Sequence, residues 1–181
     1  MNALLSTIGE SPVDTLLGLL PADAGAALAV LRRFSRQLQG RGWSFNSESR
    51  ARLLPTTDGE VPLPANTLKV DPCDPAQPYV QRGMRLYDPT TRSFAIGAAV
   101  EVDLVVALAF EDLPETARAY ILAAAARRFQ DQYLGDTTLH TFTERDEHMA
   151  YAQFLSDEAG MDDLNVLSAA PTPARILRRG K

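Results

Sequence analysis

The spacing of apolar residues predicts helices toward both ends of the chain. After Pro21, apolar side chains recur at steps of three and four, which is the spacing of one helix face. The residues concerned are Ala24, Ala27, Leu28, Leu31, Phe34 and Leu38. Gly40 and Gly42 follow them, so the helix is expected to end there, because glycine readily adopts the left-handed conformation of a helix C-cap. A short apolar segment, 2–8, and a helical turn starting at Ser11-Pro12 are expected before it.

The segment that leaves this helix carries the only tryptophan of the chain. Trp43 and Phe45 are two residues apart, with the polar Ser44 between them. Because alternate residues of a strand point to the same side, this spacing predicts that an extended strand begins at Trp43. Both rings are then expected to anchor the junction between two lobes of the protein.

Turn-forming residues divide the middle of the chain into short segments. Prolines and glycines recur there at short intervals, which is typical of a small antiparallel sheet with many turns. Two of the segments flank Gly83 and are expected to form a hairpin. The expected strands are 52–54, 67–70, 79–81, 85–87 and 98–106.

Two further helices are expected in the second half of the chain. Asp112 and Glu115 form a capping-box pattern, which predicts an alanine-rich helix that runs to about residue 134. Thr143, with acidic residues in the turn after it, predicts the start of a last helix. That helix becomes acidic toward its end, and a basic tail follows it. Its expected apolar line consists of Met149, Ala152, Leu155 and Ala159.

Together these elements predict an α+β protein. Both chain ends are expected to form a helical bundle, and a small antiparallel β lobe is expected to be inserted between them. The predicted boundaries are 1–48 and 111–165 for the two parts of the helical lobe, 49–110 for the β lobe and 166–181 for an extended C-terminal arm.

Charge and composition narrow the functional classes. The 181 residues carry a net charge of −5, which argues against a general nucleic-acid coat, because such a protein needs a basic surface to neutralise phosphates. One cysteine, Cys73, and two histidines supply too few soft ligands for a structural zinc site, so no metal or other cofactor is expected. The start of the chain lacks the features of a signal peptide, and no stretch reaches the ~20 apolar residues of a membrane span, so membrane insertion is not expected.

No motif marks a catalytic centre. The sequence has no GxGxxG or GxxxxGK[ST] phosphate loop, no GxSxG and no HExxH. His140 and His148 are eight residues apart, which is poor spacing for metal ligands. Cys73 lies among prolines without a basic neighbour to lower the pKa of its thiol, which indicates an inert loop thiol.

Paired carboxylates leave one enzymatic alternative open. Glycosidases use two carboxyl groups on either side of the scissile bond, and Glu111 with Asp112 or Glu144 with Asp146 are residues of that type. Both pairs fall near expected helix N-termini, where capping and compensation of the helix dipole are the simpler interpretation.

Short motifs spread along the chain resemble those of the tail tubular protein A family, the head-to-tail adaptors of short-tailed bacteriophages. Each motif is weak alone, but they occur in the order of the family and span nearly the whole chain. The matching segments are 2–13, 41–46, 63–66, 69–71, 80–83, 86–88, 110–118, 125–131 and 139–143 with Asp146-Glu147.

The resemblance implies a structural virion protein of the phage tail rather than an enzyme. Family members form a twelve-subunit ring below the capsid portal, dock the tail nozzle beneath it and contribute to tail fibre attachment. DNA passes through the lumen of the ring without sequence recognition. Assembly in the cytoplasm of the bacterial host is expected, and the acidic chain suits a lumen that repels phosphates.

A ring requires a head-to-tail interface that closes. The alanine-rich face of the helix 114–134, packed on the acidic last helix of the next subunit, is the expected interface. Its candidate residues are Arg118, Arg127, Arg128, Asp157 and Glu158, and the candidate portal contacts are Arg175, Arg178 and Arg179. The alternatives are a hydrolase acting on host envelope glycans, a tail protein that combines both functions, and a stand-alone protein with the same fold.

Overall fold

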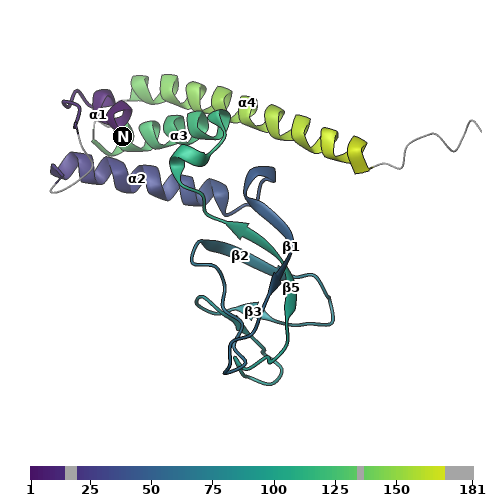
Figure 1. Cartoon of the computed structure of the whole chain (residues 1–181). Coiled ribbons are helices and arrows are strands. Elements are labelled where there is room, and N and C mark those ends of the chain that lie inside the picture. Colours follow the sequence, from purple (N-terminus) through teal and green to yellow (C-terminus); the bar gives the residue numbers. More distant parts are fainter. Residues whose placement is uncertain (15–19, 134–136, 170–181) are drawn as a thin grey trace, which may run out of the picture.

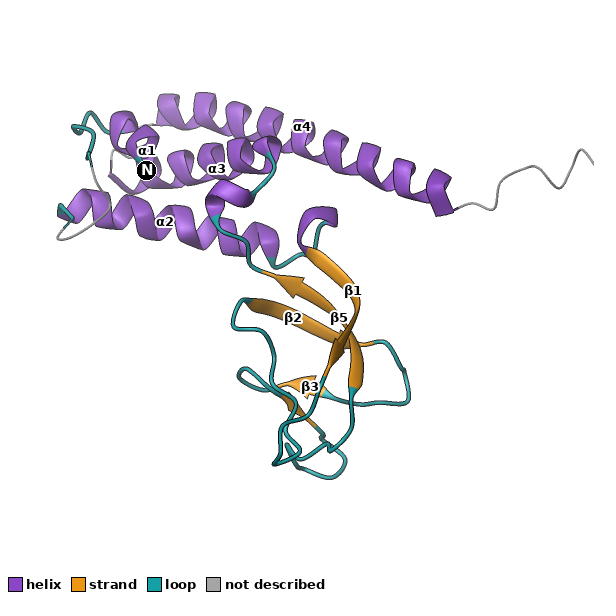
Figure 2. Ribbon diagram, in the orientation of Figure 1, coloured by secondary structure: helices purple, strands orange, loops and turns teal. Residues whose placement is uncertain are grey.

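The computed structural model describes residues 1–14, 20–133 and 137–169 (Figure 1). Its secondary structure is mixed α+β, with N-terminal helices, an antiparallel sheet and two C-terminal helices (Figure 2). The helices are α1 (Asn2–Thr7), α2 (Ala22–Gln39), α3 (Glu115–Tyr133) and α4 (Thr137–Ala169), with the short 3₁₀ helices η1 (Ser44–Asn46) and η2 (Phe110–Asp112). The strands are β1 (Ser47–Leu53), β2 (Thr67–Pro72), β3 (Val80–Gln81), β4 (Leu86–Tyr87) and β5 (Val100–Val106). The prediction of an α+β fold is confirmed.

Helix α3 lies in the middle of the helical lobe, the layer formed by α1 to α4, and packs against the other three helices. The apolar stripe predicted for α2 faces this layer: Ala24, Ala27, Leu31 and Leu38 are buried. The shared cluster also contains Leu4, Leu5, Leu113, Ala117, Ile121, Ala125, Phe129 and Phe154. The helical lobe is therefore held together by one continuous apolar core.

The β lobe hangs below the helical lobe in Figure 1 and has its own core. Its sheet has the order β1-β5-β2, and both pairings are antiparallel. Side chains of β5 alternate between buried and exposed, which is the pattern of a sheet with one face on a core. The hairpin predicted around Gly83 is confirmed, since β3 pairs with β4 and Gly83 has a φ of 68°.

The helix-to-strand transition after α2 differs from the prediction. Gly40 remains right-handed with a φ of −64°, and Gly42 is the left-handed residue with a φ of 78°. A Cβ at Gly42 would lie 3.0 Å from Cγ2 of Val105, so the position also lacks room for a side chain. The prediction of a strand from Trp43 is wrong, because η1 intervenes and β1 begins at Ser47.

Two predicted helix starts are also wrong. Helix α3 begins at Glu115 rather than after an Asp112 cap, because Asp112 belongs to η2 and Pro114 lies between. Thr143 lies inside α4, where its hydroxyl donates to the carbonyl of His140 at 3.1 Å. A threonine can satisfy its hydroxyl within a helix in this way, so the residue does not mark a helix start.

The predicted apolar line of α4 faces outward. Met149, Ala152, Leu155 and Ala159 are exposed, whereas the buried position of the described part of this helix is Phe154. Helix α4 continues to Ala169, so residues 166–169 of the expected arm are helical, and residues 170–181 lie outside the described part of the chain. Among the described residues, no helix is both long and apolar enough to cross a membrane.

Candidate functional site

The junction between the two lobes contains a buried amide pair that the sequence did not predict. The side chain of Gln39, at the end of α2, donates to the carbonyl of Leu108 at 3.2 Å and accepts from the amide of Leu108 at 2.7 Å. It thereby copies the paired hydrogen bonds of two antiparallel strands. Gln39 is 1% exposed, so water does not compete for these bonds.

Asn46 completes the junction from the last residue of η1. Its Nδ2 donates to the carbonyls of Gln39 at 2.9 Å and Val106 at 2.8 Å, and its Oδ1 accepts from the amide of Trp43 at 2.8 Å. One side chain therefore joins α2, η1 and β5. The available sequence signal was a polar residue, Gln39, in register with the buried stripe of α2.

The two predicted junction aromatics pack on the helical side. The indole of Trp43 meets the ring of Phe154 edge to face at 4.7 Å between centroids, and its Nε1 donates to the carbonyl of Leu38 at 2.7 Å. The ring of Phe45 lies 6.4 Å from that of Phe154. Both rings are partly buried against the helical core, and their role as a junction anchor stays a prediction.

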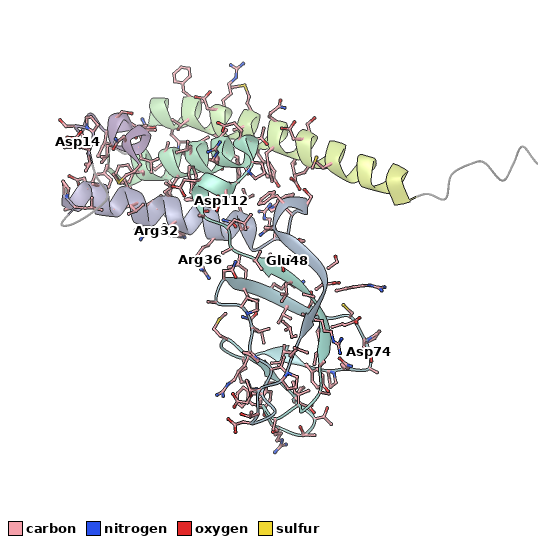
Figure 3. The ribbon with its side chains drawn as sticks, viewed as in Figure 1. Asp14, Arg32, Arg36, Glu48, Asp74 and Asp112 are labelled. Atoms are coloured by element: carbon pink, nitrogen blue, oxygen red, sulfur yellow. The ribbon has the colours of Figure 1, made fainter. Side chains whose placement is uncertain are left out.

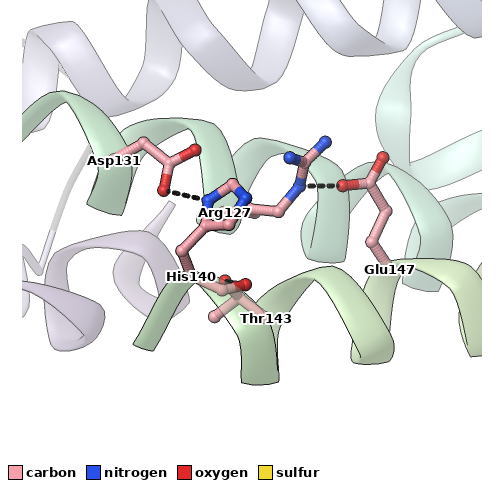
Figure 4. A network of polar contacts seen from close by, with 5 residues as sticks. All are labelled: Arg127, Asp131, His140, Thr143 and Glu147. Carbon is pink, nitrogen blue, oxygen red and sulfur yellow. Dashed lines mark hydrogen bonds and ion pairs between the residues drawn. The ribbon is translucent and has the colours of Figure 1, made fainter. Parts of the chain in front are cut away.

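Two of the five predicted subunit-interface residues bond a different element of the same chain. Arg127 on α3 forms an ion pair with Glu147 on α4, and this hydrogen bond raises the pKa of the Arg127 guanidinium (Figure 4). Beside this pair, His140 contacts Asp131 at 2.8 Å. Glu158 accepts from the amide and hydroxyl of Ser44 at 3.0 and 3.1 Å, which ties α4 to η1.

The other three predicted interface residues remain available to a partner. Arg128 is exposed. Asp157 is also exposed, and its carboxylate accepts from Gln153 on its own helix at 3.0 Å. Arg118 pairs with Glu115, but its Nε is buried without a hydrogen-bond partner. The portal-contact candidates Arg175, Arg178 and Arg179 lie outside the described residues.

The alanine-rich face of α3 is not a free surface. Ala117, Ala124 and Ala125 are at most 1% exposed, and α3 packs on α1, α2 and α4 of the same chain. The expectation that this face meets the next subunit is therefore wrong for these alanines. Their small side chains allow the helices of one subunit to approach closely.

A groove of about 770 Å³, here called the basic groove, lies between α2 and the segment from β5 to η2. Its apolar lining includes Leu28, Leu31, Leu108 and Phe110. Arg32, Arg36 and Arg118 supply positive charge to it, against one carboxylate, Glu111. Figure 3 shows Arg32 and Arg36 on the side of α2 that faces the β lobe.

The carboxylates considered for hydrolysis lie on exposed helical surface. Asp112 is exposed on η2, and Glu144 and Asp146 are exposed on α4. Glu111 lines the basic groove, where its charged neighbours are arginines. Among the described residues, no group of three or more His, Cys, Asp or Glu could hold a metal ion.

The single thiol has a partner that lowers its reactivity. Sγ of Cys73 lies 3.5 Å from Oδ1 of Asp103 on β5. Partial burial and this hydrogen bond raise the pKa of the Cys73 thiol above its ordinary value. At a given pH, a smaller fraction of Cys73 is therefore ionised than of an ordinary cysteine. The thiol reacts more slowly as a result, because the thiolate is the nucleophile.

Alkylation of Cys73 by iodoacetamide at pH 8 is therefore expected to be several-fold slower than alkylation of glutathione. Asp103→Asn should speed the reaction, because the substitution removes the negative charge that opposes ionisation. Asp74→Asn is the matched control, since this carboxylate is adjacent in sequence but does not bond the thiol. Equal rates for the two variants would show that Asp103 does not control the thiol.

Comparison with known proteins places the chain among the structural components of bacteriophage tails. The model of the family described as "Tail tubular protein" matches residues 1–164. The protein named "Tail tubular protein A" of Klebsiella phage KP34 is 30% identical over 148 residues, which cover 81% of this chain and 78% of that relative. This chain belongs to the tail tubular protein family and is a protein of the virion tail. The family resemblance seen in the sequence is confirmed.

Proposed function

We propose that this chain is the subunit of the adaptor ring of a short phage tail. In this proposal twelve copies form a ring that joins the capsid portal to the tail nozzle, encloses part of the DNA ejection channel and contributes to tail fibre attachment. The observation that carries the proposal is the family match over residues 1–164, which includes both lobes. The similarity to a protein named tail tubular protein A supports the same role.

Exposed apolar side chains support a role between partners. Phe142 and Met149 on α4 are 64% and 54% exposed. Leu54, Val80 and Met84 are exposed in the β lobe. Helix α4 and the β3 region lie on opposite sides of the molecule (Figure 1). Exposed apolar groups often mark sites of protein contact. An adaptor must present such sites on two sides, one toward the portal and one toward the nozzle.

The net charge suits a channel through which DNA slides. A chain with a net charge of −5 repels phosphates on average, so a ring of such chains does not hold DNA tightly. The proposed contact with DNA is passage without sequence recognition.

Negative-stain imaging of the purified chain, alone and with the portal ring of the same virus, tests the proposal. The expected result is a twelve-fold ring stacked on the portal. A chain that never caps the portal and never forms a ring at any concentration would contradict the adaptor role.

A further inference from the structure

The basic groove carries positive charge that is not neutralised by ion pairs within the described chain. Arg32 and Arg36 are exposed, and among the described residues neither pairs with a carboxylate. The Nε of Arg118 is buried and has no hydrogen-bond partner in the described part of the chain. Because Arg118 pairs with Glu115, Arg32 and Arg36 against Glu111 leave a local charge of about +1 in a chain whose net charge is −5. Because the groove is also lined by leucines and Phe110, it fits a partner that is both acidic and apolar.

The end of α4 has that chemistry. Asp157 and Met161 are four residues apart and therefore lie on the same face of the helix. Both are exposed, and Met161 is 53% exposed. Figure 1 shows α4 running past the start of α3 and past η1 to Ala169.

The two surfaces lie on different sides of one subunit. Helix α3 separates α4 from α2, and the basic groove lies on the side of α2 that faces the β lobe (Figures 1 and 3). A contact between them from copy to copy is therefore head-to-tail. A head-to-tail contact uses two different patches of the same chain and closes into a ring when its rotation allows.

We propose that the end of α4 in one subunit, with Asp157 and Met161, binds in the basic groove of the next subunit. Met161 contacts the apolar lining of the groove, and Asp157 pairs with Arg36 and Arg32. This inference rests on the proposed ring and names the surfaces that close it. A second copy is the fitting occupant because each chain offers both complementary surfaces, so every copy in a closed ring uses each of them once.

Charge reversal with rescue tests the contact in the full chain. Arg36→Glu alone and Asp157→Arg alone should each reduce the fraction of protein in rings by at least about tenfold, because like charges then face each other. A one-to-one mixture of the two variants should restore rings. In an alternating ring, each reversed Arg36→Glu groove receives a reversed Asp157→Arg helix end, and each unchanged groove receives an unchanged end. Analytical ultracentrifugation and negative-stain imaging, with the portal present, measure the ring fraction.

Two exposed residues provide matched controls. Arg33→Glu matches Arg36→Glu: it reverses a positive charge on α2, but at a residue that does not line the groove. Asp146→Arg matches Asp157→Arg: it reverses a negative charge on α4, but away from the end of that helix. Both controls should form rings as the unchanged chain does. Circular dichroism spectra of all four variants should match that of the unchanged chain, which checks that each variant is folded.

The outcomes separate this inference from the proposed function. If the unchanged chain forms no ring with the portal, the adaptor proposal itself fails. If the unchanged chain forms rings and the mixture of variants shows no rescue, or both reversals behave like the controls, only the α4-to-groove contact is overturned. It is also overturned if Asp157→Arg rings form normally but no longer bind the portal, since the portal would then be the occupant.

Discussion

Phe154→Ala is expected to lower the free energy of unfolding by about 3–5 kcal/mol, the range for removing a buried aromatic ring. Phe154 is fully buried, and it is the one buried side chain in the described part of α4. Its ring contacts that of Trp43 at 4.7 Å and lies 6.3 Å from that of Tyr120 on α3. The substitution therefore leaves a cavity where α4 meets both α3 and η1, and this cavity adds to the lost burial.

Urea denaturation followed by tryptophan fluorescence measures this effect, because Trp43 is the only tryptophan and lies against Phe154. Phe142→Ala is the matched control: it removes the same ring from the same helix at a position that is 64% exposed. Its effect should stay within about 0.5 kcal/mol. Similar losses for both variants would mean that Phe154 does not anchor α4.

The features predicted from the sequence are those with a local signal. The stripe of α2 follows a period of 3.6 residues within one segment and faces the core as expected. A strand was expected over 98–106, and β5 lies within this range. The hairpin at Gly83 depends on neighbours a few residues apart and was also found. Local spacing failed on α4, where a regular apolar line is exposed and the contact with α3 uses an aromatic ring and the Arg127–Glu147 ion pair instead.

The junction could not be read from the sequence because its bonds join distant segments. Gln39 bonds a residue 69 positions away, and Asn46 bonds one 60 positions away. Asparagine in a turn is common for local reasons, so its identity does not indicate a buried partner on β5. The partner of Arg127 was hidden for a similar reason: its charge predicts some acidic partner, but not that Glu147 of the same chain supplies it.

Asn46 donates two of the buried hydrogen bonds at the junction of the lobes. Asn46→Asp should lower the free energy of unfolding at pH 8 by about 3 kcal/mol or more, because an ionised side chain of the same shape cannot donate to the carbonyls of Gln39 and Val106. Both carbonyls then lose the donor that Asn46 supplies, in a site that is 1% exposed, although the carbonyl of Gln39 keeps its bond from the amide of Gly42. The bond from the amide of Trp43 to Oδ1 can persist, so the change isolates the loss of the two donated bonds.

The same substitution makes stability depend on pH in a defined direction. A protonated carboxyl can donate one of the lost bonds, so the folded state raises the pKa of the introduced group above its unfolded value of about 3.9. The stabilising protonated form is then fully present below that value and is lost as the pH rises through the folded pKa. The deficit relative to the unchanged chain should therefore be smaller at pH 4 than at pH 8.

Asn66→Asp is the matched control for this junction. Asn66 is exposed and donates one side-chain bond, at 3.1 Å, to the carbonyl of Ala107 next to the same strand. Its substitution should cost about 1 kcal/mol or less and show little dependence on pH. Urea denaturation curves of both variants at pH 4 and pH 8 measure the free energies of unfolding to be compared. If Asn46→Asp matches Asn66→Asp at pH 8, the buried bonds of Asn46 do not couple the lobes, and the apolar contacts of Leu108 with both cores must do so instead.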